Sequence, residues 1–458
     1  MNIENNTLEM EDAIQPVQKT DLIYGIDDRP PFKEAFFAAL QHLLAIFVAI
    51  ITPPLIIAGA LGLDLETTSF LVSMALFISG ISTFIQCKRF GMMGCGLLCI
   101  QGTSFSFIGP IITAGFAGGL PLIFGVCIAA APFEMVISYT FKYMRKIITP
   151  LVCGIVVLLI GLSLIKVGIV SCGGGYGAMD NGTFGSLKNI IVAATVLFSV
   201  LFFNRSKNKY LRMSSIVLGL ILGYGLSFAL GMVDTAAAAS QNLSGFTVPV
   251  PFKYGLDFNF SSFLAIGLVY VITAIEATGD VTANSMISGK EIEGKNYIKR
   301  VSGGVFADGF SSIIAGIFNS FPTSIFAQNN GIIQLTGVAS RYVGYFIAGM
   351  LVLLGLFPVV GVVFSMMPDA VLGGATLLMF GTVAAAGIRI IASQEINRKA
   401  TLVLAVSLSL GLGVELMPTI LDTAPEFVKG LFASGITTGG LTAILANIFI
   451  RVKEEKAE

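Results

Sequence analysis

Long apolar segments separated by short polar ones run along most of this 458-residue chain. A membrane-spanning helix needs about 20 predominantly apolar residues. The pattern predicts fourteen such spans, at 36–60, 68–86, 92–108, 119–141, 147–168, 187–203, 212–232, 259–280, 301–318, 323–337, 342–366, 370–388, 400–418 and 427–450. Polar tails at 1–28 and 451–458 flank them. The sequence therefore predicts an all-α polytopic membrane protein.

Two of these spans, 92–108 and 323–337, are short and rich in Gly, Ser, Thr, Gln and Asn. Each is the third span of a group of seven. An odd number of spans per half inverts the second half, and inverted repeats are common in secondary transporters. Non-helical backbone survives at membrane depth only where protein or a cavity satisfies it. We therefore predict a 7+7 inverted repeat with a substrate site between the two broken spans.

Bulk composition supports a membrane protein and excludes several other classes. The chain is 55% hydrophobic and only 12% charged, against about 25% charged residues in soluble domains. Its formal net charge is zero, so no basic excess indicates nucleic-acid binding. The six cysteines form no CxxC pair and there is one histidine; neither a metal site nor a cofactor is predicted.

The placement of Lys and Arg predicts the orientation. If both termini are cytoplasmic, 23 of the 27 Lys and Arg residues fall in cytoplasmic segments. The remaining four, Lys166, Lys188, Lys253 and Lys429, lie near the other face. This is the asymmetry of the positive-inside rule, and a wrong span count would scramble it.

Ionisable residues inside predicted spans are costly and call for a reason. Glu276 and Asp280 are four residues apart, so they share one helix face and would repel each other unless a proton or a cation intervenes. A carboxylate is also a strong acceptor for the N–H groups of a purine. The alternative is a helix-end pair exposed to water.

The other buried ionisable candidates leave more than one interpretation open. Asp308 is either a protonation site or a cap for backbone groups of a broken helix. His42, the single histidine, is either a packing residue that holds the site together or a ligand. Glu134 and Glu415 lie beside a proline or near a helix end, and we expect both to be structural.

The broken span 323–337 carries amides that could recognise a ring. Gln328 and Asn329 each offer one acceptor and two donors, as the edge of an oxopurine requires. They could instead satisfy the unwound backbone, which is the role we expect for Asn330. Phe105 could stack on a planar ring or belong to the core.

Four motifs in order resemble the nucleobase–ascorbate transporter family, also called nucleobase–cation symporter-2. The stretch from Gln328 to Gly337 matches every fixed position of its signature: Gln, Glu or Pro, then Asn, any residue, Gly, four of any kind, Thr, and Arg, Lys or Gly. Gln41–His42, the run from Glu276 to Asp280 and the run from Ala307 to Gly309 resemble further family motifs. The resemblance extends over essentially the whole membrane portion.

The resemblance implies a fold with two domains. The core domain would comprise spans 1–4 (33–141) and 8–11 (259–366), and the gate domain spans 5–7 (147–232) and 12–14 (370–450). Short strands in spans 3 and 10 would bind the substrate between them. Members are typically homodimers, and bacterial ones are proton symporters of the inner membrane.

The resemblance also implies roles for residues. Glu276 and Gln328 would hydrogen-bond the base, Asn329 would govern selectivity, and Phe105 would line the pocket with Ser104 and Ala327. Proton coupling or support of the site would come from the ionisable residues Asp308, Asp280 and His42.

The branch of the family follows from two positions. Uracil carriers have Glu at the signature Gln and His near position 280, whereas this chain has Gln328 and Asp280. It is therefore similar to the xanthine and uric acid branch. Xanthine carriers often have Asn where Ser104 stands here, and the smaller Ser leaves room for a bulkier purine such as uric acid.

We therefore expect a secondary transporter that imports a purine, xanthine or uric acid, with a proton. The alternatives are a family member for another base such as uracil, and an anion exchanger or channel of the same 7+7 fold. A membrane enzyme would need a metal set or a nucleophile–base pair, which the sequence does not suggest.

Overall fold

The computed structural model describes residues 22–144, 149–208, 211, 215–233, 246–292, 294–392, 395–425, 428, 432 and 434–450. Most of the predicted N-terminal tail (1–21) and all of the C-terminal tail (451–458) lie outside the described residues. The first half contains α1 (Phe32–Ala60), α2 (Leu65–Lys88), β1 (Gln101–Thr103), the 3₁₀ helix η1 (Phe105–Phe107), α3 (Ile108–Ala130), α4 (Pro132–Met144), α5 (Pro150–Cys172), α6 (Gly175–Asp180), α7 (Leu187–Asn204) and α9 (Ser215–Ala229). The second half contains α11 (Phe260–Ile287), α12 (Gly294–Ile317), β2 (Thr323–Ile325), α13 (Gln328–Thr336), α14 (Arg341–Leu356), α15 (Pro358–Ser365), α16 (Asp369–Ala392), α17 (Arg398–Leu416), η2 (Pro418–Leu421) and α19 (Gly435–Phe449).

Long apolar helices dominate this fold. Eight helical segments of the described chain are long and apolar enough to cross a membrane, or nine if the bent pair α14 and α15 forms one span. The predicted polytopic helical fold is confirmed at this level, and the count of fourteen stays a prediction. α9 and α19 are apolar but shorter, at 15 residues each.

Polar side chains mark where several of these helices begin. Asp64 Oδ1 accepts a hydrogen bond from Thr67 N at 2.7 Å before α2. Asn259 Oδ1 accepts from two backbone amides of the first turn of α11, at 2.9 and 3.1 Å. Such caps satisfy the orphan N–H groups of a first turn, so the ends of apolar runs coincide with ends of helices.

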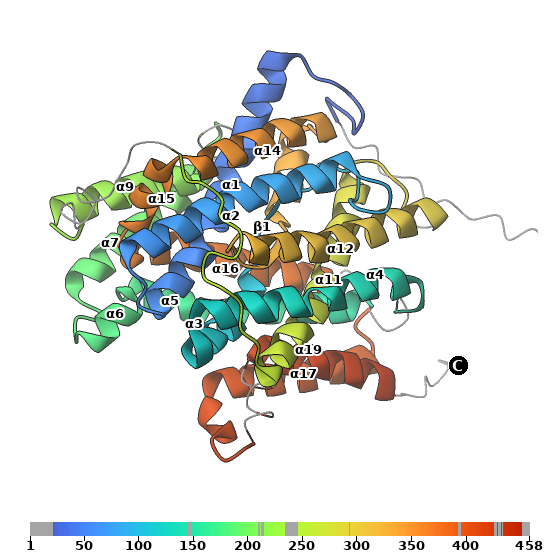
Figure 1. The fold of residues 1–458 in the computed structure, drawn as a ribbon. Coiled ribbons are helices and arrows are strands. Elements are labelled where there is room, and N and C mark those ends of the chain that lie inside the picture. The colour runs from blue at the N-terminus through green and yellow to red at the C-terminus, as the bar shows by residue number, and fades with distance from the viewer. Residues whose placement is uncertain are drawn as a thin grey trace, which may run out of the picture.

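The helices pack in two groups. In one, α2 lies against α14, α4 against α12, and α3 against α11, with the two strands among them. In the other, α16 lies along α5, α7 against α9, and α17 against α19. Figure 1 shows α17 and α19 at the bottom of the view and α7 and α9 at the left. Each group draws helices from both halves of the sequence.

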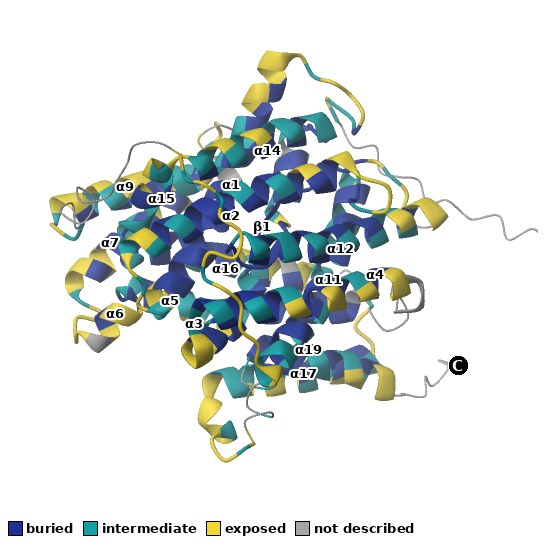
Figure 2. Ribbon diagram, in the orientation of Figure 1, coloured by how far each residue is buried: buried dark blue, intermediate teal, exposed yellow. Residues whose placement is uncertain are grey.

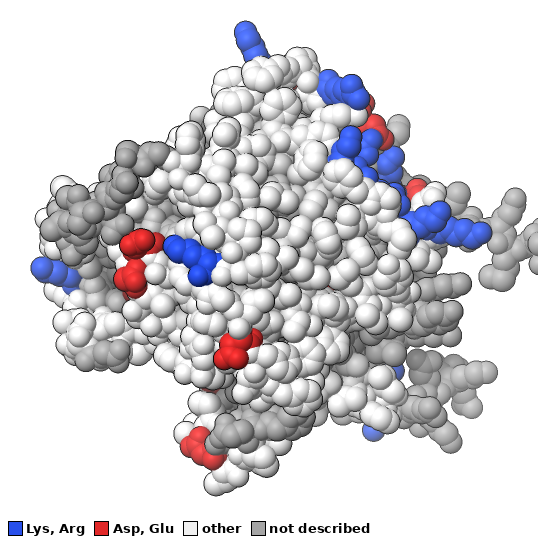
Figure 3. Space-filling model, in the orientation of Figure 1, with Lys and Arg blue, Asp and Glu red and all other residues white. Residues whose placement is uncertain are grey.

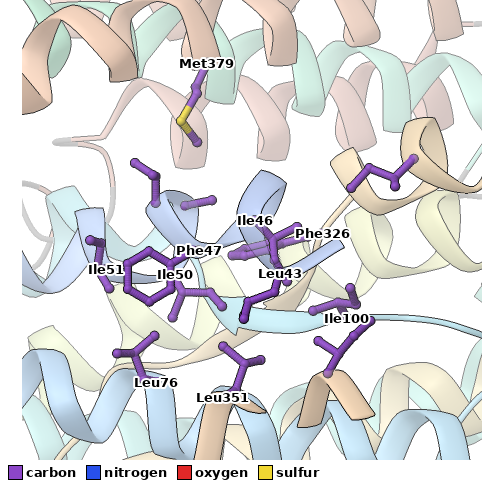
Figure 4. Packing of buried hydrophobic residues seen from close by; sticks show 14 of the residues in the cluster. Leu43, Ile46, Phe47, Ile50, Ile51, Leu76, Ile100, Phe326, Leu351 and Met379 are labelled. Atoms are coloured by element: carbon purple, nitrogen blue, oxygen red, sulfur yellow. The ribbon is translucent and has the colours of Figure 1, made fainter. Parts of the chain in front are cut away.

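The most deeply buried residues surround the strands. Figure 2 shows the buried positions concentrated in the middle of the molecule, and exposed ones at helix ends and on outward faces. One apolar cluster brings α1 against both strands: Ile46 and Ile50 of α1 lie with Ile100, just before β1, and Phe326, just after β2. Figure 4 shows these side chains together. α1 is thus an apolar support for the strand pair.

The third predicted span is displaced in the structure. We expected it at 92–108, but the helix after β1 comprises η1 and α3 and continues to Gly118, where the chain turns. Gly118 and Gly119 have non-helical backbone angles, and Gly119 has a φ of 68°. The expected end at 108 falls just before Pro110, yet this proline stands in the first turn of α3, where its missing N–H costs nothing.

The eleventh predicted span, 342–366, is bent in the structure. Its two helices, α14 and α15, meet at an angle of 77°. The break lies at Pro358, which occupies the first turn of α15. A proline there cannot continue the hydrogen-bond ladder of α14 but fits the start of a new helix.

Positive charge gathers at one end of the molecule. Figure 3 shows Lys and Arg side chains concentrated at the right of the view. Four cations that we assigned to the cytoplasmic side line one hollow of the described structure: Arg89, Lys290, Lys299 and Arg300. These four therefore share one face, as the orientation prediction requires of them.

Gly102 is predicted to be essential for the strand pair. A Cβ at this position would lie 2.5 Å from the Phe326 ring and 2.8 Å from Ile50 Cγ1. Overpacking of this kind costs about 1–3 kcal/mol, so Gly102→Ala should lower the unfolding temperature of the detergent-solubilised protein. Gly109→Ala is the control, since a Cβ added there would meet no neighbouring group within 4 Å. Equal unfolding temperatures for the two variants would contradict the close approach.

Candidate functional site

Two three-residue strands pair in the middle of the molecule. β1 and β2 are antiparallel, with Gln101 opposite Ile325, Gly102 opposite Ser324 and Thr103 opposite Thr323. Two further bonds extend the pairing, from Ser104 N to Pro322 O and from Phe326 N to Ile100 O, both at 2.9 Å. All six strand residues are buried. The strands satisfy each other's backbone where neither belongs to a helix.

Each strand is followed by a helix that starts beside the pair. η1 and α3 follow β1, and α13 follows β2. The N-terminus of a helix carries partial positive charge and free N–H groups. The two strands and the helix starts that follow them therefore present polar backbone groups at the centre of an apolar molecule.

Asp308 is fixed to β1 by a side chain. Gln101 donates from Nε2 to Asp308 Oδ1 at 2.6 Å, and its own backbone N donates to Thr83 Oγ1 at 3.1 Å. The Asp308 side chain is fully buried. Its second oxygen, Oδ2, has no hydrogen-bond partner in the described part of the chain. Through this hydrogen bond Asp308, a residue of α12, fixes the position of β1 in the first broken span.

His42 and Asn329 form a second buried link. His42 Nδ1 lies 2.7 Å from Asn329 Oδ1, and Asn329 Nδ2 donates to Leu98 O at 2.5 Å. With the amide in this orientation its oxygen can only accept, so Nδ1 of the histidine carries the hydrogen. Both side chains are fully buried. The structure thus uses Asn329 to connect α1, α13 and the chain before β1.

Asn330 and Asn284 form a third link. Asn284 Nδ2 donates to Leu98 O and to Asn330 Oδ1, both at 2.9 Å, and Asn330 Nδ2 donates to the backbone oxygen of Asp280 at 3.3 Å. Asn330 thus joins α13 to the regular helix α11, rather than satisfying the unwound backbone as we expected. The Asp280 residue is only partly buried, and its Oδ2 has no partner among the described groups.

Glu276, Gln328 and Ala327 form the accessible part of the site. Glu276 on α11 is partly buried, and its Oε2 accepts a hydrogen bond from Ser106 Oγ at 3.1 Å. Gln328 begins α13 and is partly buried, and Ala327 before it is exposed. α11 contacts both η1 and α13. The Glu276 carboxyl offers an acceptor and the Gln328 side chain an amide, and neither takes part in the three buried links described above.

Ser104 and Phe105 directly follow β1. The Phe105 ring is half-buried and meets the Phe380 ring of α16 edge-on, with 5.3 Å between centroids. Phe105 therefore connects the group of helices that contains the strands with the group that contains α5 and α16. The Ser104 hydroxyl is buried with no partner in the described chain, although its backbone N is bonded to Pro322 O.

The residues that the sequence nominated for the site lie on elements that contact one another around the strand pair. His42, Glu276, Asp280, Asp308, Asn329 and the rest lie on α1, α11, α12 and α13 and in the two broken spans. Sequence reasoning missed their partners Gln101, Ser106 and Asn284. Gln101 and Ser106 stand in the broken span already singled out, which is the one signal that could have found them. Within the described residues no group of three His, Cys, Asp or Glu side chains could hold a metal ion.

The two acids expected to be structural differ in the structure. Glu415 on α17 accepts from Gly435 N at 3.2 Å and lies 3.9 Å from Lys166 Nζ. Glu134 on α4 is fully buried, and neither of its carboxylate oxygens has a partner in the described chain. Glu134 therefore lacks the contacts of a structural acid.

Comparison with known proteins identifies the family. Residues 33–420 match the family model Xan_ur_permease, described as "Permease family". The chain belongs to the nucleobase–ascorbate transporter family. It is 49% identical to xanthine permease XanP of Escherichia coli K12, over 97% of this chain and 98% of XanP. It is 48% identical to xanthine permease XanQ of the same strain, over 94% of each chain.

A more distant relative and two solved structures complete the comparison. Nucleobase transporter PlUacP of Paenibacillus larvae is 36% identical, over 91% of this chain and 95% of PlUacP. Murine Slc26a9, an anion transporter in the inward-facing state, has a TM-score of 0.61 at 11% identity, over 92% of this chain and 69% of that one. The transmembrane domain of the cyanobacterial bicarbonate transporter BicA has a TM-score of 0.53 at 13% identity, over 92% and 100%. The two structures share the fold, and the family makes this chain a multi-pass membrane transporter rather than an enzyme.

The link between Gln101 and Asp308 should be essential for transport by this permease. Gln101→Leu removes the donor and leaves a buried carboxylate oxygen unpaired; hydrogen bonds to charged groups contribute about 1.5–3 kcal/mol. We expect initial uptake of the transported base to fall about tenfold or more at unchanged membrane abundance. Asn296→Leu, at an exposed amide of α12, is the control. Wild-type uptake by Gln101→Leu would show that the link is dispensable.

Proposed function

We propose that this permease imports a purine base, xanthine first, by proton symport. The carrying observation is Glu276, a partly buried carboxyl on α11 whose Oε2 is held by Ser106 of η1 at 3.1 Å. It offers an acceptor for an N–H of the base, and the Gln328 amide offers a donor and an acceptor at the start of α13. The identity of 49% with a xanthine permease supports xanthine as the first substrate.

The transport cycle follows from the two packing groups. We assign α1–α4 with α11–α15 and both strands to a core domain, and α5–α9 with α16–α19 to a gate domain, in fourteen spans. The base binds beside the strand pair, under the edge contact between Phe105 and Phe380. The core then moves against the gate and releases the base to the cytoplasm, the side of the cation-rich end and of both termini.

The energetics suffice for accumulation. One proton that crosses about 100 mV releases roughly 2.3 kcal/mol. At about 1.4 kcal/mol per tenfold, this supports on the order of 50-fold accumulation of a neutral base before any pH gradient is counted. The proposal places the protein in the bacterial inner membrane as a homodimer, which mass measurement in gently solubilised membranes tests.

Uptake of labelled xanthine in cells that lack their own purine permeases tests this function. Excess unlabelled uric acid, uracil and sulfate serve as competitors. Saturable uptake that an uncoupler abolishes, that uric acid inhibits and that uracil and sulfate do not, is the expected result. Inhibition by sulfate with no effect of the uncoupler would favour an anion exchanger of the same fold. Absence of xanthine uptake by a correctly inserted protein would overturn the substrate assignment.

Glu276→Gln should weaken binding of the base. A hydrogen bond to an ionised group is worth about 1.5–3 kcal/mol, or about 10- to 100-fold in affinity. We expect the KM for xanthine to rise by at least tenfold. Ser106→Ala keeps the carboxyl but removes its donor, so its effect should be smaller. A KM for Glu276→Gln within twofold of wild type would remove Glu276 from the binding site.

Ser104→Asn should narrow the selectivity. The Ser104 hydroxyl is buried without a partner among the described groups beside the strand pair, and the larger amide fills space there. We expect uric acid to compete less well against labelled xanthine, with the inhibition constant raised several-fold and xanthine uptake retained. Ser206→Asn, at a serine of the loop after α7 far from the strands in sequence, is the control. Unchanged competition by uric acid would assign selectivity to other residues.

A further inference from the structure

Glu134 is a buried carboxyl that the transport site described above does not use. It stands in the first turn of α4, and its side chain is fully buried. An acid in a first turn ordinarily interacts with free N–H groups of the helix. Here neither oxygen accepts a hydrogen bond from any described group. Capping therefore does not account for Glu134.

α4 and α12 are in close contact at this point. A Cβ on Gly309 would lie 3.2 Å from Glu134 Cβ and 3.1 Å from Ala131 O. Gly309 directly follows Asp308. The Asp308 carboxyl is a close neighbour of the Glu134 carboxyl, and its Oδ2 also lacks a partner in the described chain. The two carboxyl groups, each with an unpartnered oxygen, face each other across the contact of two helices.

Among the described residues, the Glu134–Asp308 pair has another carboxyl group nearby and forms no ion pair with a Lys or Arg side chain. The groups that face Glu134 from α11 are the Glu276 carboxyl, the Thr273 side chain and the Tyr270 phenol. The ion pairs of the described chain lie elsewhere: Lys166–Glu415, Arg300–Glu291 and Arg341–Asp27. Two adjacent carboxylates without a cation repel strongly, so such a pair shares a proton.

We propose that Glu134 and Asp308 form a proton-binding site, separate from the base-binding acid Glu276. The hydrogen bond from Gln101 Nε2 to Asp308 Oδ1 favours the ionised form of Asp308, and no such donor reaches Glu134 in the described chain; the proposal therefore places the proton on Glu134 as O–H. That O–H donates to Asp308, and the pair with one proton has a charge of −1. Loss of the proton to water would leave two repelling carboxylates between α4 and α12.

This site would couple the proton to the base through the strand. Asp308 holds Gln101 of β1, and Ser104 and Ser106 follow within five residues of it. A change in the protonation of the pair alters the pull on Gln101 and hence the position of the segment that contacts Glu276. The proton enters and leaves as H⁺, and no bond of the base changes. The inference rests on the proposed proton symport.

Glu134→Gln separates a coupling role from a packing role, because the amide keeps the shape and can still donate to Asp308 but cannot release a proton. In proteoliposomes we expect counterflow exchange of labelled base within about threefold of wild type. Uphill accumulation driven by an imposed pH gradient, and proton uptake on addition of base, should fall by tenfold or more. The pH profile of uptake should flatten. Glu415→Gln, the same change at a partnered acid of α17, is the matched control.

Wild-type accumulation and an unchanged pH profile in Glu134→Gln would overturn the inference. If wild type itself takes up no proton with the base, the proposed symport fails instead, so the two failures are distinct. If Glu134→Gln does not insert, infrared difference spectra of the Glu276→Gln variant decide. A protonated-carboxyl C=O band that titrates there and is lost when Asp308→Asn is added is expected. Its absence, or its persistence in the double variant, would overturn the proposal.

Discussion

The pairing of β1 with β2 is the constraint on which the rest of the structure depends. Three residues from each half of the chain leave the helical conformation in the middle of an apolar molecule, and they satisfy one another's backbone. The pairing leaves room for no side chain at Gly102, where Phe326 and Ile50 close over the strand. Because each strand interrupts its span, a helix begins directly after it, and both helix N-termini lie beside the strand pair. A continuous pair of helices would have left no free N–H groups there.

Four polar links around the strands join the first half of the chain to the second. His42 meets Asn329, Gln101 meets Asp308, Ser106 meets Glu276, and the Leu98 carbonyl meets Asn284. The partners are between 170 and 287 residues apart. Neither half could therefore form the site alone, and these buried acids and amides depend on the docking of the other half. A ligand bound at the candidate site would lie beside the hydrogen bonds that join the two halves.

The sequence was sufficient for the helical fold and for the polar breaks at which the candidate site is proposed, for identifiable physical reasons. Long apolar runs require a membrane, and a short polar run among them requires a break. Four motifs then identified Glu276, Gln328 and their neighbours. The pairings were out of reach, because Gln101 gives no local sign that its amide will meet an aspartate 207 residues away. The helix of the third span lies later in the chain than expected because residues Gln101–Thr103 form a strand, and the helix starts only after it.

Glu134 illustrates the same limit with a different outcome. A glutamate two residues after a proline and near a helix end has an adequate local explanation, so sequence reasoning assigned it a structural role. Only the contact of α4 with α12 at Gly309 brings it to Asp308. Glu415 had an equally adequate local explanation and does have the partners of a structural acid. What separates the two is whether another group compensates the carboxyl. In a membrane interior, an acid that no other group compensates is costly unless it holds a proton, and a group that holds a proton in this way is what the proposed proton symport requires.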